Sequence, residues 1–229
     1  MTLLCLDTST NYAICAVAEK NGDLRRSASI PSERSLSTRL YPLIEGVLAD
    51  AGLALERIDA FGVGVGPGSF TGIRVAVTTM RTLAQVLQKP LAAVPTLDLY
   101  AEPWRGAARE VHVAAPSRRN EVYSALYSPN HSAPRLSTAS YQQIRQYGRD
   151  AAAGARIVGP GALLAQIFPE GQSASQALLT PMDAPSAEAL ARLCADRIAA
   201  GRLADPLSLD PLYIAAAAVS QHKTATAGP

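Results

Sequence analysis

The sequence predicts an α/β protein of two lobes, each a mixed β-sheet covered by helices. The length of 229 residues suits one large domain or two small lobes. Short apolar runs alternate with stretches of helical periodicity in the first half of the chain. A strand-turn-strand pattern restarts after Gly106, so we expect an internal duplication with lobes at residues 1–104 and 105–229.

The first lobe is expected to open with a three-stranded antiparallel meander, because Asn21-Gly22-Asp23 between apolar runs is typical of a hairpin. Helices and buried strands then alternate. In order, we expect strands at residues 3–6, 13–18 and 24–30, a helix at 40–51, a strand at 58–65, a helix at 71–87, a strand at 91–94 and a helix at 96–101. Ser37 or Thr38 is available as the first helix's N-cap, and Gly52 as its end.

The second lobe is expected to begin with strands at residues 111–115 and 121–127, joined by a polar turn. Residues 157–162 resemble a second strand-to-helix turn, similar to the one that follows residue 65. We expect the residues after Ser220 to be frayed.

Composition excludes several classes of protein. Twenty-one basic and 19 acidic residues leave a net charge of +2, and aromatic residues make up 5%, so a dedicated nucleic-acid binder is not indicated. No apolar run approaches the roughly 20 residues of a membrane span, and the N-terminus lacks a basic signal-peptide region. We expect a cytoplasmic protein without membrane contact, with Cys5, Cys15 and Cys194 as reduced core thiols.

One glycine-rich turn could bind an anion. Residues 65–74 read VGPGSFTGIR, which exposes backbone N–H groups at the start of a helix. The spacing fits neither a Walker loop, nor a dinucleotide fingerprint, nor a nucleophile elbow. From spacing alone, a close-packed turn that positions the helix is the favoured interpretation, and anion binding is the alternative. The candidate cofactor-binding residues are Gly66, Gly68 and Ser69 here, with Asp7, Thr8 and Ser9 of the first polar turn.

No catalytic or metal-binding set is indicated. His112, His131 and His222 are scattered, and the sequence has no Cys-x-x-Cys pair and no local Ser-His-carboxylate signature. We therefore predict no metal site and no catalytic residues in this chain.

The helix expected at residues 71–87 is apolar on most of its circumference, with Arg74 and Arg81 as its only charges. Such a helix must be buried on two sides. One side can lie on the sheet. The other requires either the preceding helix or a second protein, and the sequence leaves both open.

Four segments resemble the TsaB (YeaZ-type) family: residues 6–10 (LDTST), 64–74 (GVGPGSFTGIR), 121–123 (EVY) and 211–214 (PLYI). The resemblance covers nearly the whole chain in order. It implies the duplicated ASKHA fold of actin, hexokinase and Hsp70, and a non-catalytic scaffold subunit. It further implies a TsaD-like catalytic partner that transfers a threonylcarbamoyl group to adenosine 37 of tRNA, a TsaE-like ATPase, and a homodimer when the chain is alone.

The resemblance also implies where partners and cofactors lie. No cofactor is expected on the isolated chain, ATP and a metal ion are expected on partner subunits, and tRNA contact is expected only indirectly. Family members pair through two helices of the first lobe. The corresponding interface residues are Leu40, Tyr41, Ile44, Val47, Ile73, Arg74, Val77, Met80 and Arg81. Val77→Glu or Met80→Arg is then expected to abolish pairing.

Three positions depart from the family's pattern. Leu36 stands where relatives often carry His, Pro116 where they carry Asp, and Ala215 where they commonly carry Arg. An alternative function is an ASKHA-type phosphotransferase that acts alone with ATP, using Asp7 and the glycine-rich turn. A metallopeptidase is excluded by the missing ligands.

Overall fold

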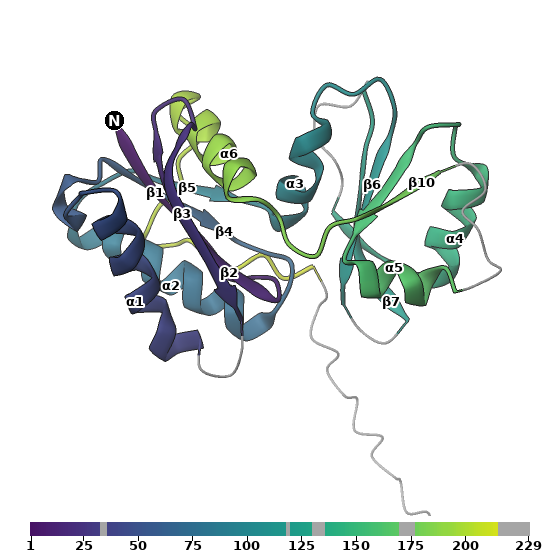
Figure 1. Ribbon diagram of the computed structural model, residues 1–229, viewed down its shortest axis with the longest axis horizontal. Coiled ribbons are helices and arrows are strands. Elements are labelled where there is room, and N and C mark those ends of the chain that lie inside the picture. The colour runs from purple at the N-terminus through teal and green to yellow at the C-terminus, as the bar shows by residue number, and fades with distance from the viewer. Residues whose placement is uncertain (33–35, 118–119, 130–135, 170–176, 215–229) are drawn as a thin grey trace, which may run out of the picture.

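The computed structural model describes residues 1–32, 36–117, 120–129, 136–169 and 177–214. Two five-stranded sheets lie side by side, with helix α3 (Thr96–Ala101) between them (Figure 1). The predicted architecture of two mixed sheets flanked by helices is confirmed. The sequence-based expectations for His131, Ala215 and the residues after 220 concern positions outside the described residues.

The first sheet combines an antiparallel meander with two parallel strands. Its strands are β1 (Thr2–Asp7), β2 (Tyr12–Glu19), β3 (Leu24–Pro31), β4 (Ala60–Gly64) and β5 (Leu91–Val94). The order is β3-β2-β1-β4-β5, with β4 parallel to β1 and to β5. β1 is buried along its whole length, because alternate side chains enter two different core layers: Leu4 and Leu6 one, Leu3 and Cys5 the other.

Helices α1 (Leu36–Asp50) and α2 (Phe70–Val86) cover one face of this sheet and pack against its apolar side chains. α1 ends in a Schellman motif, as the predicted stop at Gly52 requires. Gly52 has φ +66°, its N–H donates to the carbonyl of Ala49 at 2.9 Å, and the N–H of Leu53 donates to that of Leu48 at 3.0 Å. The prediction of an N-cap at residue 37 or 38 is wrong, because the helix already begins at Leu36.

The second sheet repeats the pattern of the first. Its strands are β6 (Val111–Pro116), β7 (Glu121–Tyr127), β8 (Ser137–Ser140), β9 (Arg156–Gly159) and β10 (Leu178–Pro181). The order is β10-β9-β6-β7-β8, again an antiparallel meander joined to parallel strands. Helices α4 (Tyr141–Asp150) and α5 (Gly161–Ile167) share one apolar core with this sheet, and α3 contributes to another.

Two helices pack on the sheet of the opposite lobe. α3 belongs to the first half of the chain, yet its Leu97 and Tyr100 pack with β6 and β9 of the second sheet. α6 (Ala187–Ala199) belongs to the second half, yet its Leu190 and Cys194 pack on the face of the first sheet opposite α1 and α2. The structure therefore differs from the expected division at residue 104, since each lobe receives one helix from the other half of the chain.

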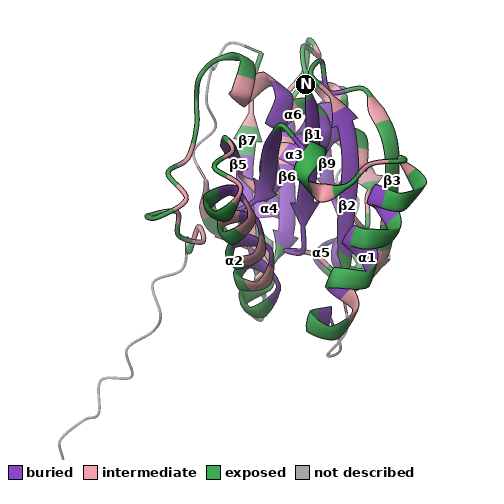
Figure 2. Cartoon of the chain, turned by 90° about the vertical axis from the view of Figure 1, so that its left-hand side faces the viewer, coloured by how far each residue is buried: buried purple, intermediate pink, exposed green. Residues whose placement is uncertain are grey.

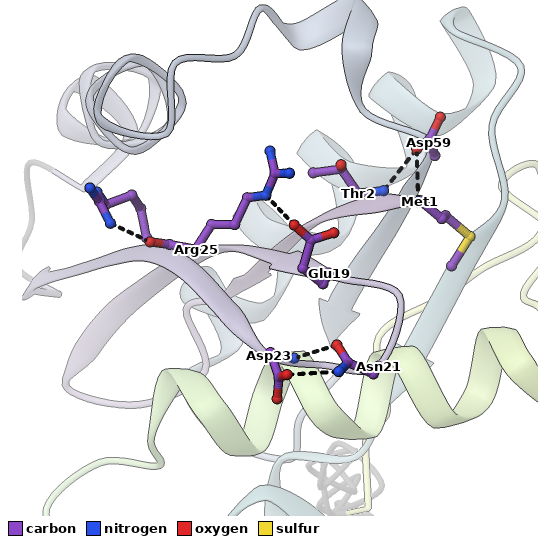
Figure 3. A network of polar contacts seen from close by, with 8 residues as sticks. Met1, Thr2, Glu19, Asn21, Asp23, Arg25 and Asp59 are labelled. Carbon is purple, nitrogen blue, oxygen red and sulfur yellow. Dashed lines mark hydrogen bonds and ion pairs between the residues drawn. The ribbon is translucent and has the colours of Figure 1, made fainter.

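The predicted hairpin at Asn21-Gly22-Asp23 is confirmed. Gly22 has φ +88°, and the side chain of Asn21 both accepts from the N–H of Asp23 at 3.2 Å and donates to its carboxylate at 2.7 Å (Figure 3). A Cβ on Gly22 would lie 2.7 Å from the Cα of Arg192 in α6. Position 22 of the hairpin therefore requires glycine for two reasons: its positive φ, and the close approach of α6.

The N-terminus is tied to the loop that precedes β4. Asp59 accepts a hydrogen bond from the N–H of Thr2 at 2.8 Å and lies 3.8 Å from the amino group of Met1 (Figure 3). The contacts fix the register of β1 beside β4.

The five strands of the first sheet, strands β6 and β7, and the helices over residues 40–51, 71–87 and 96–101 were predicted close to their observed positions. β8, α4, β10 and α6 were not predicted. Cys5, Cys15 and Cys194 are buried free thiols, as expected. No helix among the described residues is long and apolar enough to cross a membrane.

His112 on β6 makes the stability of the second lobe dependent on pH. Its Nε2 lies 2.6 Å from the Ser124 hydroxyl, its Nδ1 is buried without a hydrogen bond among the described residues, and its ring meets the edge of Tyr147 at 4.5 Å. Burial lowers the pKa of His112 from 6.5 to about 4. Between these values the unfolded chain binds a proton that the folded chain does not, so stability falls as the pH falls.

We predict that wild-type protein loses about 1 to 2 kcal/mol more unfolding free energy than the His112→Gln variant when the pH drops from about 7 to about 5. Glutamine keeps an amide group for Ser124 and removes the titration. Urea unfolding of both proteins at the two pH values measures the difference. Equal losses would show that His112 does not titrate with the shifted pKa.

Candidate functional site

The two candidate binding turns lie against each other. The first polar turn (residues 7–10) follows β1, and the glycine loop (residues 65–69) follows β4. The N–H of Ser69 donates to the carbonyl of Ser9 at 2.7 Å, and the hydroxyl of Thr8 donates to the carbonyl of Gly72 at 2.5 Å. Because β1 and β4 are parallel neighbours, their carboxyl ends meet at one edge of the sheet, and the two turns pack backbone against backbone.

Three glycines make this approach possible. A Cβ on Gly68 would lie 2.1 Å from the carbonyl oxygen of Ser9, and a Cβ on Gly72 would lie 1.9 Å from that of Thr8. On β4, a Cβ on Gly64 would lie 1.7 Å from the Asp7 carboxylate. Of the two interpretations left open by the sequence, the structure favours the close-packed turn.

The carboxylate of Asp7 is fully buried and bonded internally. It accepts from the N–H of Ser9 at 3.0 Å, from the hydroxyl of Ser9 at 2.7 and 3.0 Å, and from the hydroxyl of Thr96 at 3.2 Å. Burial raises the pKa of Asp7, and the hydrogen bonds from Ser9 and Thr96 oppose that rise. Asp7 and Thr8 are 0% exposed, so neither can reach a ligand in this conformation.

The N-terminus of α2 is capped by the protein itself. The Ser69 side chain accepts from the N–H of Gly72 at 3.2 Å, as an N-cap residue does. The carbonyl of Ser9 accepts from the N–H of Ser69, so two backbone N–H groups at this end of the helix, those of Ser69 and Gly72, already have acceptors within the protein.

An interlobe pocket of about 230 Å³ remains beside the two turns. Pro67, Pro116 and Pro160 line it from both lobes, together with Tyr100 and other side chains. Burial is the main cause that raises the pKa of Tyr100, so its hydroxyl stays protonated near neutral pH. The pocket is smaller than the roughly 300 Å³ of common ligand sites, and Asp7 is not part of its lining. Three of the candidate cofactor-binding residues, Ser9, Gly68 and Ser69, do line this pocket.

The family departures at Leu36 and Pro116 lie in different surroundings. Leu36 is 6% exposed and belongs to the apolar core below α1 and α2. Pro116 is exposed and forms part of the wall of the interlobe pocket. Neither adds a charge at its position.

The structure places most of the predicted interface residues in the core of the first lobe. Six of the nine residues are buried in the core between α1, α2 and the first sheet, at 0 to 4% exposure, although Leu40 and Ile44 also reach the floor of the groove between the two helices. The six are Leu40, Ile44, Val47, Ile73, Val77 and Met80. Val77→Glu or Met80→Arg would therefore disrupt the core instead of testing an interface. Tyr41 and Arg74 are exposed, and Arg81 is half-buried.

An open groove runs between the outer faces of the same two helices. This α1–α2 groove has a volume of about 430 Å³. It is lined by Ser37, Leu40, Tyr41, Ile44, Arg74, Val75, Thr78 and Thr79. Figure 2 shows the exposed outer faces of both helices beside the buried sheet. The sequence analysis missed Val75, Thr78 and Thr79, although helical periodicity places them opposite the apolar stripe.

A C-terminal segment (residues 203–214) runs along the other side of α2. Arg81 donates to the carbonyls of Leu207 at 2.8 Å and Leu209 at 3.1 Å. Arg74 donates to the hydroxyl of Tyr213 at 2.9 Å. The N–H of Leu212 donates to the carbonyl of Val65 at 2.8 Å, which ties the segment to the glycine loop. Arg74 and Arg81 therefore both hold the C-terminal segment against α2.

Within the described residues, no group of three or more His, Cys, Asp or Glu side chains is placed to hold a metal ion.

A protein-family model described as TsaD: tRNA N6-adenosine threonylcarbamoyltransferase matches residues 30–180, more than half of the chain. The tRNA threonylcarbamoyladenosine biosynthesis protein TsaB of Haemophilus influenzae is 36% identical over 129 residues, which cover 54% of this chain and 52% of that protein. The chain spans about half the length of the curated relatives that it matches.

Solved structures extend the likeness to almost the whole chain. A Pseudomonas aeruginosa protein described as similar to peptidase YEAZ has a TM-score of 0.75 and 30% identity, and the match covers 93% of this chain and 99% of that chain. An activator of 2-hydroxyisocaproyl-CoA dehydratase from Clostridium difficile has a TM-score of 0.52 and 11% identity, over 88% of this chain and 97% of that chain. The second match concerns the fold alone.

The molecule has a duplicated two-lobe fold of the ASKHA type. In each lobe an antiparallel meander continues into parallel strands. The chain belongs to the TsaB (YeaZ-type) family, within the wider family that the TsaD model describes.

The close approach of Gly72 to the Thr8 carbonyl can be tested by substitution. Gly72→Ala should destabilise the protein by roughly 2 to 3 kcal/mol or prevent folding, because the new methyl group would meet a backbone oxygen. Gly46→Ala in α1 is the control, since nothing lies within 4 Å of its Cβ position. It should stabilise the protein by about 0.5 to 1 kcal/mol through helix propensity. Chemical unfolding of both variants measures this contrast, and similar effects would contradict the close approach.

Proposed function

We propose that this protein is the subunit that binds a TsaD-like catalytic protein and supports threonylcarbamoyl transfer to adenosine 37 of tRNA. Membership of the TsaB (YeaZ-type) family carries the proposal. The Haemophilus influenzae relative is a tRNA threonylcarbamoyladenosine biosynthesis protein by name. The α1–α2 groove supplies the surface through which the subunit would act.

The outer face of α2 has the character of a docking surface. Thr78 and Thr82 are exposed there, Val75 is half-exposed, and Val86 is 72% exposed. None of these four carries a charge. Across the groove, Tyr41 of α1 is 63% exposed and offers a large aromatic side chain. Depletion of charge at the centre, together with an aromatic anchor, is typical of the core of a protein-protein interface.

The closed state of the Asp7 turn supports a non-catalytic part in the reaction. A phosphotransferase needs a carboxylate that reaches its substrate, and Asp7 is 0% exposed with its oxygens bonded to Ser9 and Thr96. We therefore assign ATP and the metal ion to a TsaD-like partner and a TsaE-like ATPase, and tRNA contact to those partners. In their absence, a second copy of this chain would cover the same groove and form a homodimer.

We predict that Thr78→Arg weakens binding of the TsaD-like protein by roughly a hundredfold, because a guanidinium at the centre of the groove would be buried without a partner. Thr138→Arg is the matched control: the same substitution at an exposed position of β8 in the second lobe. Both variants should fold, since neither threonine is buried. Calorimetric titration of each against the purified partner measures the effect. Wild-type affinity in the Thr78 variant would refute the docking surface.

Reconstitution tests the activity itself. The isolated chain should form no threonylcarbamoyladenosine, whereas its addition to the TsaD-like and TsaE-like proteins with tRNA should raise product formation at least tenfold. Thr78→Arg should abolish this stimulation and Thr138→Arg should preserve it. Mass spectrometry of digested tRNA measures the product. Turnover by the isolated chain, or a complete reaction without it, would overturn the proposal.

A further inference from the structure

A cavity of about 440 Å³ lies on the other side of α3 from the interlobe pocket. Its walls come from α3, the short helix η2 (Glu102–Trp104) with the loop after it, the ends of β6 and β7, and α6 with the turn that follows. Four arginines line it, which define what we call the arginine pocket: Arg105, Arg109, Arg197 and Arg202. The volume falls within the range of sites for small organic molecules, roughly 300 to 1,000 Å³.

Two of the four guanidinium groups are held by carboxylates. Arg105 forms an ion pair with Asp196 of α6, and Arg197 lies 3.5 Å from Asp98. Asp98 also accepts from the hydroxyl of Tyr127 at 2.8 Å, so this acceptor is shared. These pairs link α3 and η2 to α6 and fix the pocket's framework.

The other two guanidinium groups have no counter-ion. Neither Arg109 nor Arg202 makes a side-chain hydrogen bond or ion pair in the described part of the chain. Both are exposed. Four arginines and three carboxylates line the cavity, a formal net charge of +1, and Arg192, which lies 3.6 Å from the Glu102 carboxylate, raises the local charge to about +2.

The remaining wall is largely apolar and aromatic. Trp104, Tyr127, Val111 and Leu193 line the pocket beside the arginines. Trp104 is the single tryptophan of the chain. A ligand with a planar or apolar portion would contact these side chains while its anionic group meets the arginines.

The arginine pocket is separate from the interlobe pocket. Thr96 and Tyr100, four residues apart on α3, line the interlobe pocket, whereas Asp98 and Glu102 line the arginine pocket. Residues four apart share a helix face, and a residue two positions away points to the opposite face. α3 therefore forms the wall between two cavities, and a ligand in one does not occupy the other.

We propose that the arginine pocket binds a small phosphorylated molecule, with its phosphate at Arg109 and Arg202 and its apolar part against Trp104. A phosphate monoester carries between about 1.5 and 2 negative charges near pH 7, which matches the two unpaired guanidinium groups, whereas a single carboxylate carries one. Guanidinium groups also bind phosphate oxygens in bidentate geometry. This inference goes beyond the proposed function, since the pocket lies away from the α1–α2 groove.

Phenyl phosphate is the probe, because it joins a phosphate monoester to a planar ring. Titration of the isolated full chain at constant ionic strength should give a saturable change in Trp104 fluorescence with a dissociation constant below about 1 mM. Benzoate, with one carboxylate on the same ring, should bind at least tenfold more weakly. The absence of a saturable change, or equal binding of benzoate, would overturn the proposal.

The double variant Arg109→Gln/Arg202→Gln should weaken phenyl phosphate binding at least tenfold. Its fold should be preserved, because neither side chain has a partner to lose, and thermal unfolding checks this. Arg39→Gln/Arg57→Gln is the control, with the same change of charge at residues outside the pocket lining. Binding that survives the first variant, or falls equally in both, would show that overall charge and not this pocket attracts the anion. None of these measurements requires a TsaD-like protein, so their failure would leave the proposed function intact.

Discussion

The contact between the turn after β1 and the N-terminus of α2 is the constraint on which the rest of the first lobe depends. Ser69 donates to the carbonyl of Ser9, Thr8 donates to that of Gly72, and glycine at positions 68 and 72 allows the two backbones to meet. A contact between backbones fixes the position of α2 more rigidly than side-chain packing alone. It also buries the carboxylate of Asp7, so the feature that positions the helix closes the candidate cofactor site.

With its N-terminus fixed, α2 is covered on two sides by the part of the chain that the structure describes. The first sheet covers its apolar stripe, and the C-terminal segment covers a second side through Arg81 and Arg74. What remains is the groove toward α1, with Thr78 and Val75. The two arginines, which look like interface charges in the sequence, hold the C-terminal segment in place and so define the edge of that surface.

The sequence allowed most of the first lobe to be predicted, because its strands and helices are local patterns bounded by clear turns. It did not reveal that α6 packs on the first sheet, since that contact joins residues such as Cys5 and Cys194, which lie far apart in the chain. Most of the predicted interface residues are core residues for a related reason. Apolar residues at helical spacing mark a buried face, and only the structure distinguishes a face buried by its own sheet from one that awaits a partner. Thr78 is polar and gave no such signal.

The exchange of α3 and α6 between the lobes accounts for both cavities. α3 starts at the glycine loop, where the N–H of Thr96 donates to the carbonyl of Gly66 at 2.7 Å, and then packs on the second sheet. One face of α3 must therefore close the interlobe pocket beside Asp7, and the opposite face must meet α6. Charged residues of α6 and of the segment around η2 meet at that second contact, where Arg105 and Asp196 form an ion pair. Arg109 and Arg202 line the same cavity without a counter-ion among the described residues. The same helix thus separates the interlobe pocket from a charged cavity on its opposite face.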